Sequence, residues 1–370
     1  MKVLISGASV AGPALAYWLA RHGVTPTIVE SAPAPRPGGQ AIDVRGAALT
    51  VVERMGLLEE VRAARTQMLG MSMVDNAGNE LMRSTEHTQS GGRLDGDDIE
   101  VLREDLTALL ATRTSDVEYI FGDSIRAIHQ DADGVDVTFE RGAPRRFDLV
   151  VGADGLHSNV RRLAFGPEER FAQHLGSYVA VFTADNVLGL DRWQVWLNDG
   201  EAGAGIYTAR DNAELRVNIG FMSGPLAYDR RDLDAQRQLI ADRTAGLGWE
   251  IPRLLKAMWQ APDFYFDAMA QIHMDTWSAG RVTLVGDAAH CASPLSGQGT
   301  SLALVGAYLL ADELARGFDG ALVRDLDGAL GRYEARMRPF AEVNQALATE
   351  NPGSPASEES MERANHAITL

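Results

Sequence analysis

Cysteine is almost absent from this sequence, since Cys291 is the one cysteine among 370 residues. A single thiol excludes an intrachain disulfide and any metal cluster built from several cysteines. Disulfide-stabilised proteins belong mainly to oxidising compartments outside the cell. We therefore expect a protein of the cell interior, with the cytoplasm as its compartment, and we expect no metal site.

Long apolar runs and a surplus of positive charge are also missing. No apolar run reaches the roughly 20 residues that a membrane-spanning helix needs. Residues 1–7 enter a strand pattern directly, without the basic flank, apolar stretch and cleavage site of a signal peptide. The 51 acidic and 34 basic side chains leave a net charge of −17, which repels nucleic-acid backbones. We expect neither a membrane span nor a nucleic-acid partner.

What the sequence does contain begins with a strand, a glycine-rich turn, a helix and a second strand over residues 2–30. Val3, Leu4 and Ile5 predict a short buried strand. Apolar residues at helical spacing over 13–22, followed by Gly23, predict a helix that ends there. Residues 27–30 predict the second strand, which completes a βαβ unit.

Period-2 patterns dominate further along the chain. Hairpins are predicted where residues 71–75 and 80–83 flank a turn, and where 125–129 and 135–139 flank another. A run of antiparallel strands is expected at 178–183, 194–197, 205–207 and 215–221. Helices are expected at about 232–246, 251–260, 300–315 and 322–349, and a buried strand at 282–285.

These elements predict a mixed α/β (α+β) protein in which two lobes interleave along the chain. A Rossmann-like, cofactor-binding lobe would be assembled from residues 1–66, 100–170 and 278–320. A β-rich substrate lobe would come from residues 67–99 and 171–277. A C-terminal helix over 321–350 would follow, and then a tail over 351–370 that begins with a linker at 351–355 and continues as a short, frayed segment.

The turn at residues 7–12 has the pattern of a dinucleotide-binding fingerprint. Glycines there permit a tight turn and a close approach of backbone to pyrophosphate, and the following helix offers free N–H groups. Ser9 replaces the middle glycine, and alone the turn could be a structural corner. Glu30 follows Gly12 by 18 residues, however, and an acid at this distance accepts ribose hydroxyls. The expected contacts are Gly7, Ser9, Val10, Ala11, Gly12, Glu30 and Ser31.

A second glycine-rich segment, at residues 285–301, favours FAD over a nicotinamide dinucleotide. Asp287, at the end of a buried strand, can hydrogen-bond the hydroxyls of a ribityl chain, which NAD lacks. The loop after it leads into a long helix whose N–H groups suit a reduced, anionic isoalloxazine. The expected contacts are Gly286, Asp287, Pro294, Gly297, Gln298, Gly299, Thr300 and Ser301.

At three places the chain resembles the flavoprotein monooxygenases of the para-hydroxybenzoate hydroxylase type. These places are the glycine turn with Glu30, Asp154-Gly155 within residues 150–161, and Gly286-Asp287. Their order and separation over about residues 1–345 are specific, whereas each alone is weak. The resemblance is strongest to the short members that hydroxylate polycyclic or antibiotic-like substrates, including the tetracycline-modifying enzymes.

The resemblance implies that the Rossmann-like lobe binds FAD and assigns roles there. Asp154 would lie near FAD, in a segment associated with NAD(P)H use, and Asp287 would bind the ribityl chain. Pro294 and Gly297 match the loop beside the reacting edge of the flavin, and would also border the substrate pocket.

Two arginines and two strand residues complete the expected site. Arg45 and Arg103 match arginines that contact the cofactor, and a guanidinium suits that task because it stays charged. The alternative is an ion pair with the acids at 104–105. Phe221 and Met222, on a strand of the β-rich lobe, are expected to line the pocket for the substrate.

The implied activity is a monooxygenase reaction. NAD(P)H would reduce FAD, O₂ would add to give a flavin C4a-hydroperoxide, and its distal oxygen would hydroxylate a planar aromatic or polycyclic small molecule. No catalytic acid or base emerges from the sequence, and a phenolic substrate could supply its own activation. His290 and Cys291 suggest a reactive pair, but Cys291 is expected to be a small packed residue.

Three other flavoprotein classes share the same kind of cofactor lobe. A flavin-dependent halogenase is excluded because Leu247 replaces the first tryptophan of that family's signature, and because no lysine lies between Lys2 and Lys256. A reductase of the geranylgeranyl-reductase type would saturate double bonds without consuming oxygen. A flavin-binding protein without turnover would bind FAD but show no ligand-stimulated NAD(P)H oxidation. The last two alternatives remain open.

Overall fold

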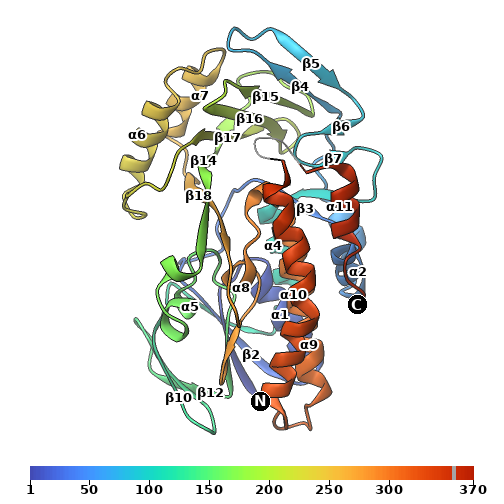
Figure 1. Ribbon diagram of the computed structural model, residues 1–370, viewed down its shortest axis with the longest axis vertical. Helices are drawn as coiled ribbons and strands as arrows, with labels where there is room; N and C mark the ends of the chain where they lie inside the picture. The colour runs from blue at the N-terminus through green and yellow to red at the C-terminus, as the bar shows by residue number, and fades with distance from the viewer. Residues whose placement is uncertain (352–355) are drawn as a thin grey trace.

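The structure is a computed structural model that describes residues 1–351 and 356–370. The linker predicted at 351–355 lies, from residue 352 on, outside the described residues. The molecule is elongated, with a parallel sheet and its helices towards one end and a larger, mainly antiparallel sheet at the other (Figure 1). The expected mixed α/β fold class is confirmed.

A six-stranded sheet forms the lower part of Figure 1. Its strands are β1 Lys2–Ser6, β2 Thr25–Glu30, β9 Glu118–Phe121, β13 Leu149–Gly152, β19 Ser278–Ala279 and β20 Val282–Leu284. The order is β19-β20-β13-β1-β2-β9, and all neighbours except β19 and β20 are parallel. Strands buried on both faces need continuous apolar sequence, and Val3, Leu4 and Ile5 are fully buried in β1.

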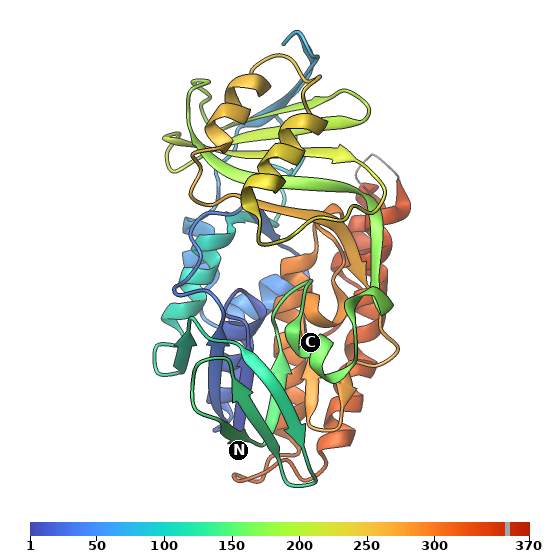
Figure 2. The same ribbon diagram turned by 90° about the vertical axis from the view of Figure 1, so that its left-hand side faces the viewer.

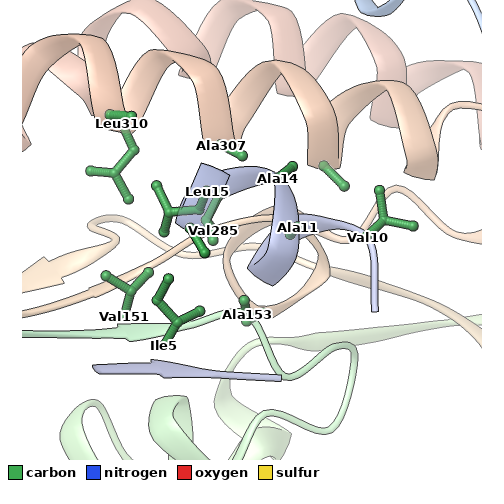
Figure 3. Packing of buried hydrophobic residues seen from close by; sticks show 14 of the residues in the cluster. Ile5, Val10, Ala11, Ala14, Leu15, Val151, Ala153, Val285, Ala307 and Leu310 are labelled. Atoms are coloured by element: carbon green, nitrogen blue, oxygen red, sulfur yellow. The ribbon is translucent and has the colours of Figure 1, made fainter. Parts of the chain in front are cut away.

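Three long helices pack beside this sheet: α1 Ala11–Arg21, α9 Gly299–Arg316 and α10 Leu326–Glu350. Figure 3 shows Ala14 and Leu15 of α1 between β1 and α9, in the larger of the two apolar cores. No helix in the described part of the chain is long and apolar enough to cross a membrane. The other helices near this sheet are α2 Ala47–Arg54, α3 Leu58–Ala63, α4 Arg103–Thr112, α5 Asn159–Ala164, η1 Glu168–Arg170, α8 Asp287–His290 and η2 Pro294–Ser296.

A seven-stranded sheet lies at the opposite end. Its strands are β4 Gly70–Val74, β5 Glu80–Ser84, β14 Ala172–Asp185, β15 Trp193–Asn198, β16 Ala202–Ala209, β17 Glu214–Met222 and β18 Tyr265–Ile272. The order is β18-β14-β17-β16-β15-β4-β5, and β4 pairs with β15 in parallel. Helices α6 Leu233–Arg243 and α7 Ile251–Met258 cover its outer face and bury a second apolar core (Figure 2).

The described residues also form three smaller sheets, one of which holds β10 Ile125–Gln130, β11 Val135–Phe139 and β12 Arg145–Phe147. The other two pair β3 Ala41–Val44 with β8 Ile99–Leu102, and β6 His87–Thr88 with β7 Gly92–Arg93. Strand β18 links the two ends of the molecule, because Phe266 lies in the second core and Ile272 in the first.

Most predicted elements are confirmed within a few residues, including the βαβ unit and both hairpins. The C-terminal tail differs, because it forms helix α11 Glu358–Asn365 rather than a frayed segment. Ala364 is fully buried, and a Cβ on Gly46 would lie 2.3 Å from the Asn365 carbonyl oxygen. This helix is ordered by contacts with residues far away in the chain, which a local pattern does not reveal.

A hydrogen bond between α10 and β20 gives a prediction for stability. The buried Tyr333 hydroxyl donates to the Leu284 carbonyl at 3.1 Å. Tyr333→Phe should lower the free energy of unfolding by about 1 kcal/mol, because the carbonyl would remain buried without its donor. Tyr308→Phe, which removes an exposed hydroxyl that accepts from Arg54 at 2.6 Å, is the control. Urea unfolding that showed equal losses in both variants would contradict this account.

Candidate active site

The turn between β1 and α1 leaves no room for side chains at two positions. Gly7 has a φ of +111°, and a Cβ there would lie 2.3 Å from the Ala153 carbonyl oxygen. A Cβ on Gly12 would lie 1.9 Å from the Gly7 carbonyl oxygen. Ser9 is exposed, and Val10 precedes a helix that has neither a side-chain cap nor an acidic residue in its first turn. The first N–H groups of α1 could therefore bind an anion.

Glu30 lies at the end of β2, beside this turn. Its Oε2 accepts from the Ala8 N–H at 2.9 Å. Its Oε1 accepts from the Ala32 N–H at 2.8 Å and from the Ser31 hydroxyl at 3.1 Å. The structure thus brings the predicted acid to the glycine turn, with lone pairs left for further donors such as ribose hydroxyls.

Asp154 lies at the end of β13 and is half-buried. Its carboxylate accepts from the Ser158 hydroxyl, from the Ser6 hydroxyl at 3.2 Å and from the Val160 N–H at 3.0 Å. Burial raises the pKa of Asp154, while these hydrogen bonds oppose the rise. The geometry gives Asp154 a positioning role, since it joins α5 to β1 directly behind the glycine turn.

Arg161 has no assigned role in the sequence analysis, yet it connects two of the motifs. Its side chain is fully buried, and its Nη1 donates to the Ala288 carbonyl of α8 at 3.0 Å. Its Nη2 pairs with Glu168 at 3.0 Å. The one feature of the sequence that indicates a buried role for Arg161 is its place beside apolar residues in a short helix.

The Gly286-Asp287 motif touches the glycine turn. Gly286 has a φ of +63°, and a Cβ there would lie 3.2 Å from the Cβ of Ala11. The surrounding protein desolvates the Asp287 carboxyl and raises its pKa to about 6. A Cβ on Gly299 would lie 3.9 Å from Asp287 Oδ1, so this carboxyl lies beside the start of α9. Hydroxyl donors would stabilise its ionised form.

The loop from Cys291 to Gly297 leads the chain into α9. Burial raises the pKa of the Cys291 thiol, and its Sγ donates to the Ala270 carbonyl at 3.6 Å, which supports a packed residue rather than a nucleophile. Ser293 and Gly297 turn the chain with φ values of +70° and +65°. Like α1, α9 begins without a side-chain cap and without an acid in its first turn.

Arg45 lies next to this loop and is paired within the protein. Its Nη2 lies 2.8 Å from Asp43 and its Nη1 lies 3.6 Å from Asp98. Its backbone N–H donates to the Ser301 hydroxyl at 3.1 Å. Burial raises the pKa of Asp43 to about 7, although Arg45 opposes the rise. A Cβ on Gly297 would lie 3.9 Å from Arg45 Nη2, so the guanidinium borders the loop.

Arg103 is different, because its charge has no carboxylate partner in the part of the chain that the structure describes. Among the described residues no acidic oxygen lies within 4.0 Å of its guanidinium, and its Nη2 donates only to the Gly38 carbonyl at 3.1 Å. The neighbouring Glu104 instead pairs with Arg216 at 2.9 Å. Burial and the nearby Arg36 lower the pKa of Arg103. The Arg103 guanidinium therefore has no ion-pair partner among the described residues and is available to an anionic ligand.

Together these residues fit FAD. A half-buried cation without a counterion and two uncapped helix starts suit pyrophosphate and an anionic ring. Two carboxylates with free lone pairs suit hydroxyls. The residues that could hold the cofactor are Gly7, Ser9, Val10, Ala11, Gly12, Glu30, Ser31, Arg103, Gly286, Asp287, Gln298, Gly299, Thr300 and Ser301.

The two strand residues expected in the substrate pocket point in opposite directions. Phe221 is buried in the second core, and its ring is stacked with that of Tyr178 at 5.5 Å between centroids. The guanidinium of Arg243 in α6 lies over the Phe221 ring. Phe221 therefore faces the outer helices and not the rest of the site. Met222 is 54% exposed on the other face of the sheet. Because successive side chains of a strand point to opposite faces, the sequence pattern fits either face for Phe221. The position of α6 shows that Phe221 points to the outer face.

The inner face of the sheet is turned towards the cofactor residues. The Tyr207 hydroxyl accepts from the Ala41 N–H at 2.6 Å, and Arg216 pairs with Glu104 at 2.9 Å. Gln194 is paired with Tyr207 across the strands and so lies on the same face. Of the residues on this face, the sequence indicated a role only for Met222, because nothing local distinguishes the inner face from the outer one.

His157 joins the two ends of the molecule. Its Nε2 lies 2.9 Å from Asp267 of β18, and its Nδ1 lies 2.9 Å from Glu168. Burial lowers the pKa of His157, but hydrogen bonds to both carboxylates outweigh that effect and raise it to about 9. His157 is therefore a cation at neutral pH and serves as an ion-pair partner rather than a general base.

Comparisons with known proteins agree with this geometry. A family described as FAD binding domain matches residues 1–347. A flavin-dependent monooxygenase of Legionella longbeachae serogroup 1 (strain NSW150) is 40% identical over 345 residues, which are 93% of this chain and 87% of that protein. This chain belongs to the FAD-dependent monooxygenase family. The predicted family and its FAD cofactor are thereby confirmed.

Two further relatives match this chain over its whole length. The uncharacterised protein Rv1260 of Mycobacterium tuberculosis (strain H37Rv) is 54% identical over 372 residues, covering 100% of this chain and 98% of that protein. The crystal structure of the tetracycline destructase Tet(55) superimposes with a TM-score of 0.88 at 37% identity, covering 100% of this chain and 98% of that one.

The unpaired charge of Arg103 gives a prediction for cofactor affinity. Arg103→Met should weaken FAD binding roughly 10- to 100-fold, because it removes a charge-assisted contact. It should also stabilise the FAD-free protein, since the desolvated cation is lost. Arg113→Met, at the exposed end of the same helix, is the control. Fluorescence titration with FAD and urea unfolding measure the two effects, and unchanged affinity would contradict the assignment.

The His157 ion pairs give a prediction for pH. A pKa raised from 6.5 to about 9 contributes stability that is complete below pH 6.5 and is lost as pH rises through about 9. Urea unfolding of the wild type should therefore show a decline on the order of 2 kcal/mol across this range. His157→Gln should flatten the decline, whereas substitution of the exposed His129 should not. A decline that persists in His157→Gln would refute the assignment.

Proposed function

We propose that this chain is an FAD-dependent monooxygenase that uses NAD(P)H and O₂ to hydroxylate a planar aromatic or polycyclic small molecule. The observation that carries the proposal is the unpaired Arg103 beside an uncapped helix start and Glu30, in a chain that belongs to this family. The tetracycline destructase match, which spans the whole chain, supports a polycyclic substrate.

In this proposal the two ends of the molecule divide the work. Residues 1–66, 100–170 and 278–320 hold FAD, residues 67–99 and 171–277 hold the substrate, and residues 321–350 form a supporting helix. Glu30 and Ser31 accept the adenosine ribose, and the start of α1 with Arg103 binds the pyrophosphate. Asp287 accepts the ribityl hydroxyls, and Gly299, Thr300 and Ser301 lie at the ring.

The bound FAD supplies the redox chemistry, taking electrons from NAD(P)H and passing them to O₂. The protein contributes position and charge. The start of α9 places its N–H groups where negative charge develops on a reduced ring. Pro294 and Gly297 border the substrate on the cofactor side, and Met222 lies on the inner face of the sheet. Arg45, paired with Asp43, borders the loop that contains Pro294 and Gly297.

The first experiment is a visible absorption spectrum of the purified protein, repeated anaerobically with NADPH and with NADH. We expect an oxidised-flavin spectrum that bleaches slowly alone and faster with tetracycline or another polycyclic phenol. In air, oxygen uptake should match NAD(P)H oxidation. Bleaching without oxygen uptake would favour a reductase, and bound FAD without stimulated oxidation would favour a binding protein. A protein that takes up no flavin would refute the proposal.

A further inference from the structure

Trp196 of β15 lies on the inner face of the seven-stranded sheet. It follows Gln194 by two residues on the same strand, so both side chains leave the same face. Gln194 is paired with Tyr207, whose hydroxyl accepts from the Ala41 N–H at 2.6 Å. The indole of Trp196 is therefore turned towards the residues that fit FAD.

The indole lies flat across the neighbouring strand. Trp196 is paired with Gly205 of β16, and a Cβ on Gly205 would lie 2.4 Å from the indole Cζ3 and 2.5 Å from its Cη2. Glycine at this position is what allows the ring to occupy that place. Asn218 of β17 is paired with Gly205 from the other side and brings an amide to the edge of the surface.

A chain of hydrogen bonds fixes the orientation of this ring. The Trp196 Nε1–H donates to Gln194 Oε1 at 3.0 Å, and Gln194 Nε2 donates to the Ser90 hydroxyl at 2.6 Å. The Ser90 carbonyl in turn accepts from Arg45 Nη2 at 3.1 Å. Arg45 borders Gly297, in the loop expected at the reacting edge of the flavin. The hydrogen bonds that orient the ring thus lead to an arginine that borders this loop.

The faces of this indole have no aromatic or cationic partner in the described chain. Three of the other tryptophans have such a partner: Trp18 has Tyr17 and Tyr308, Trp193 has Arg83, and Trp277 has His290, Tyr333 and Arg338. Trp249 and Trp259 also lack one among the described residues, but they flank α7 and so do not lie on the inner face of the sheet. No such contact involves Trp196. A half-buried indole with a satisfied N–H and no stacking partner suits a planar ring, which would gain an offset-stacked contact.

We propose that the Trp196 indole is the platform on which the planar substrate stacks. The proposal rests on the proposed function and names the residue that selects an aromatic substrate. Trp196 is a binding residue that acts by contact, and Gly205 makes that contact possible by leaving space for the ring. Substrates with a flat ring system and a polar group that reaches Asn218 would bind best.

The test measures binding of two probes, tetracycline and 2-naphthol, to the oxidised holoenzyme by isothermal titration calorimetry. Trp196→Leu should raise the dissociation constant roughly fivefold to tenfold, and Trp196→Phe should restore much of the loss. Gly205→Ala should weaken binding similarly, because its methyl group displaces the ring. Trp193→Phe, on the same strand but the opposite face, is the matched control and should leave binding unchanged.

The outcomes separate this inference from the proposed function. FAD content should stay at the wild-type level in every variant, because neither Trp196 nor Gly205 is among the residues that fit FAD. Unchanged binding in Trp196→Leu and Gly205→Ala would overturn the platform alone. If Trp196→Leu does not fold, the loss expected in Gly205→Ala tests the platform, and Trp196→Phe is the variant expected to keep most of the affinity. A wild type that binds neither probe would overturn the aromatic substrate class and the platform with it.

Discussion

The backbone of the β1–α1 turn and the end of β13 are in closer contact than any side chain would permit. A Cβ at Gly7 would lie 2.3 Å from the Ala153 carbonyl oxygen, so these segments meet backbone to backbone. The next residue, Asp154, collects hydrogen bonds from β1 and from α5. Arg161 of α5 then reaches the Ala288 carbonyl at 3.0 Å, which ties the third motif to the other two. The residues that fit FAD are far apart in sequence, and these backbone and side-chain contacts bring them close together.

Residues with a local signature could be predicted from the sequence. Gly7 and Glu30 lie at or just beyond the ends of strands, and Gly12, Asp287 and Gly299 lie in or at the start of the helices that follow, where alternation and glycine spacing reveal them. The direction of Phe221 could not be predicted, because it depends on which face α6 and α7 cover. Arg161 and Gln194 bond to partners remote in the chain, and α11 is ordered by equally distant contacts. The side of the sheet on which Trp196 lies depends, like that of Phe221, on which face α6 and α7 cover. These features need the tertiary structure.

Arg45 and Arg103 show why sequence alone could not separate a paired arginine from one that awaits a ligand. Both have acidic residues close by in the sequence. Arg45 turns to Asp43 and Asp98, whereas the acid beside Arg103 turns away to Arg216 and Arg210. An arginine whose neighbours are already engaged retains its charge for another molecule. Whether the acid beside an arginine pairs with it or with another residue depends here on the position of β17, which lies more than 100 residues later in the chain.

Strand β18 contributes to both apolar cores, with Phe266 in one and Ile272 in the other. Its partner β14 runs beside it over the same span. The pairing shifts register between His174 and Tyr178, but two strands that are hydrogen-bonded on both sides of this shift still connect the two cores. The two ends of the molecule should therefore unfold in a single transition. Access for large molecules would then come from rearranged loops and not from a hinge between the two ends.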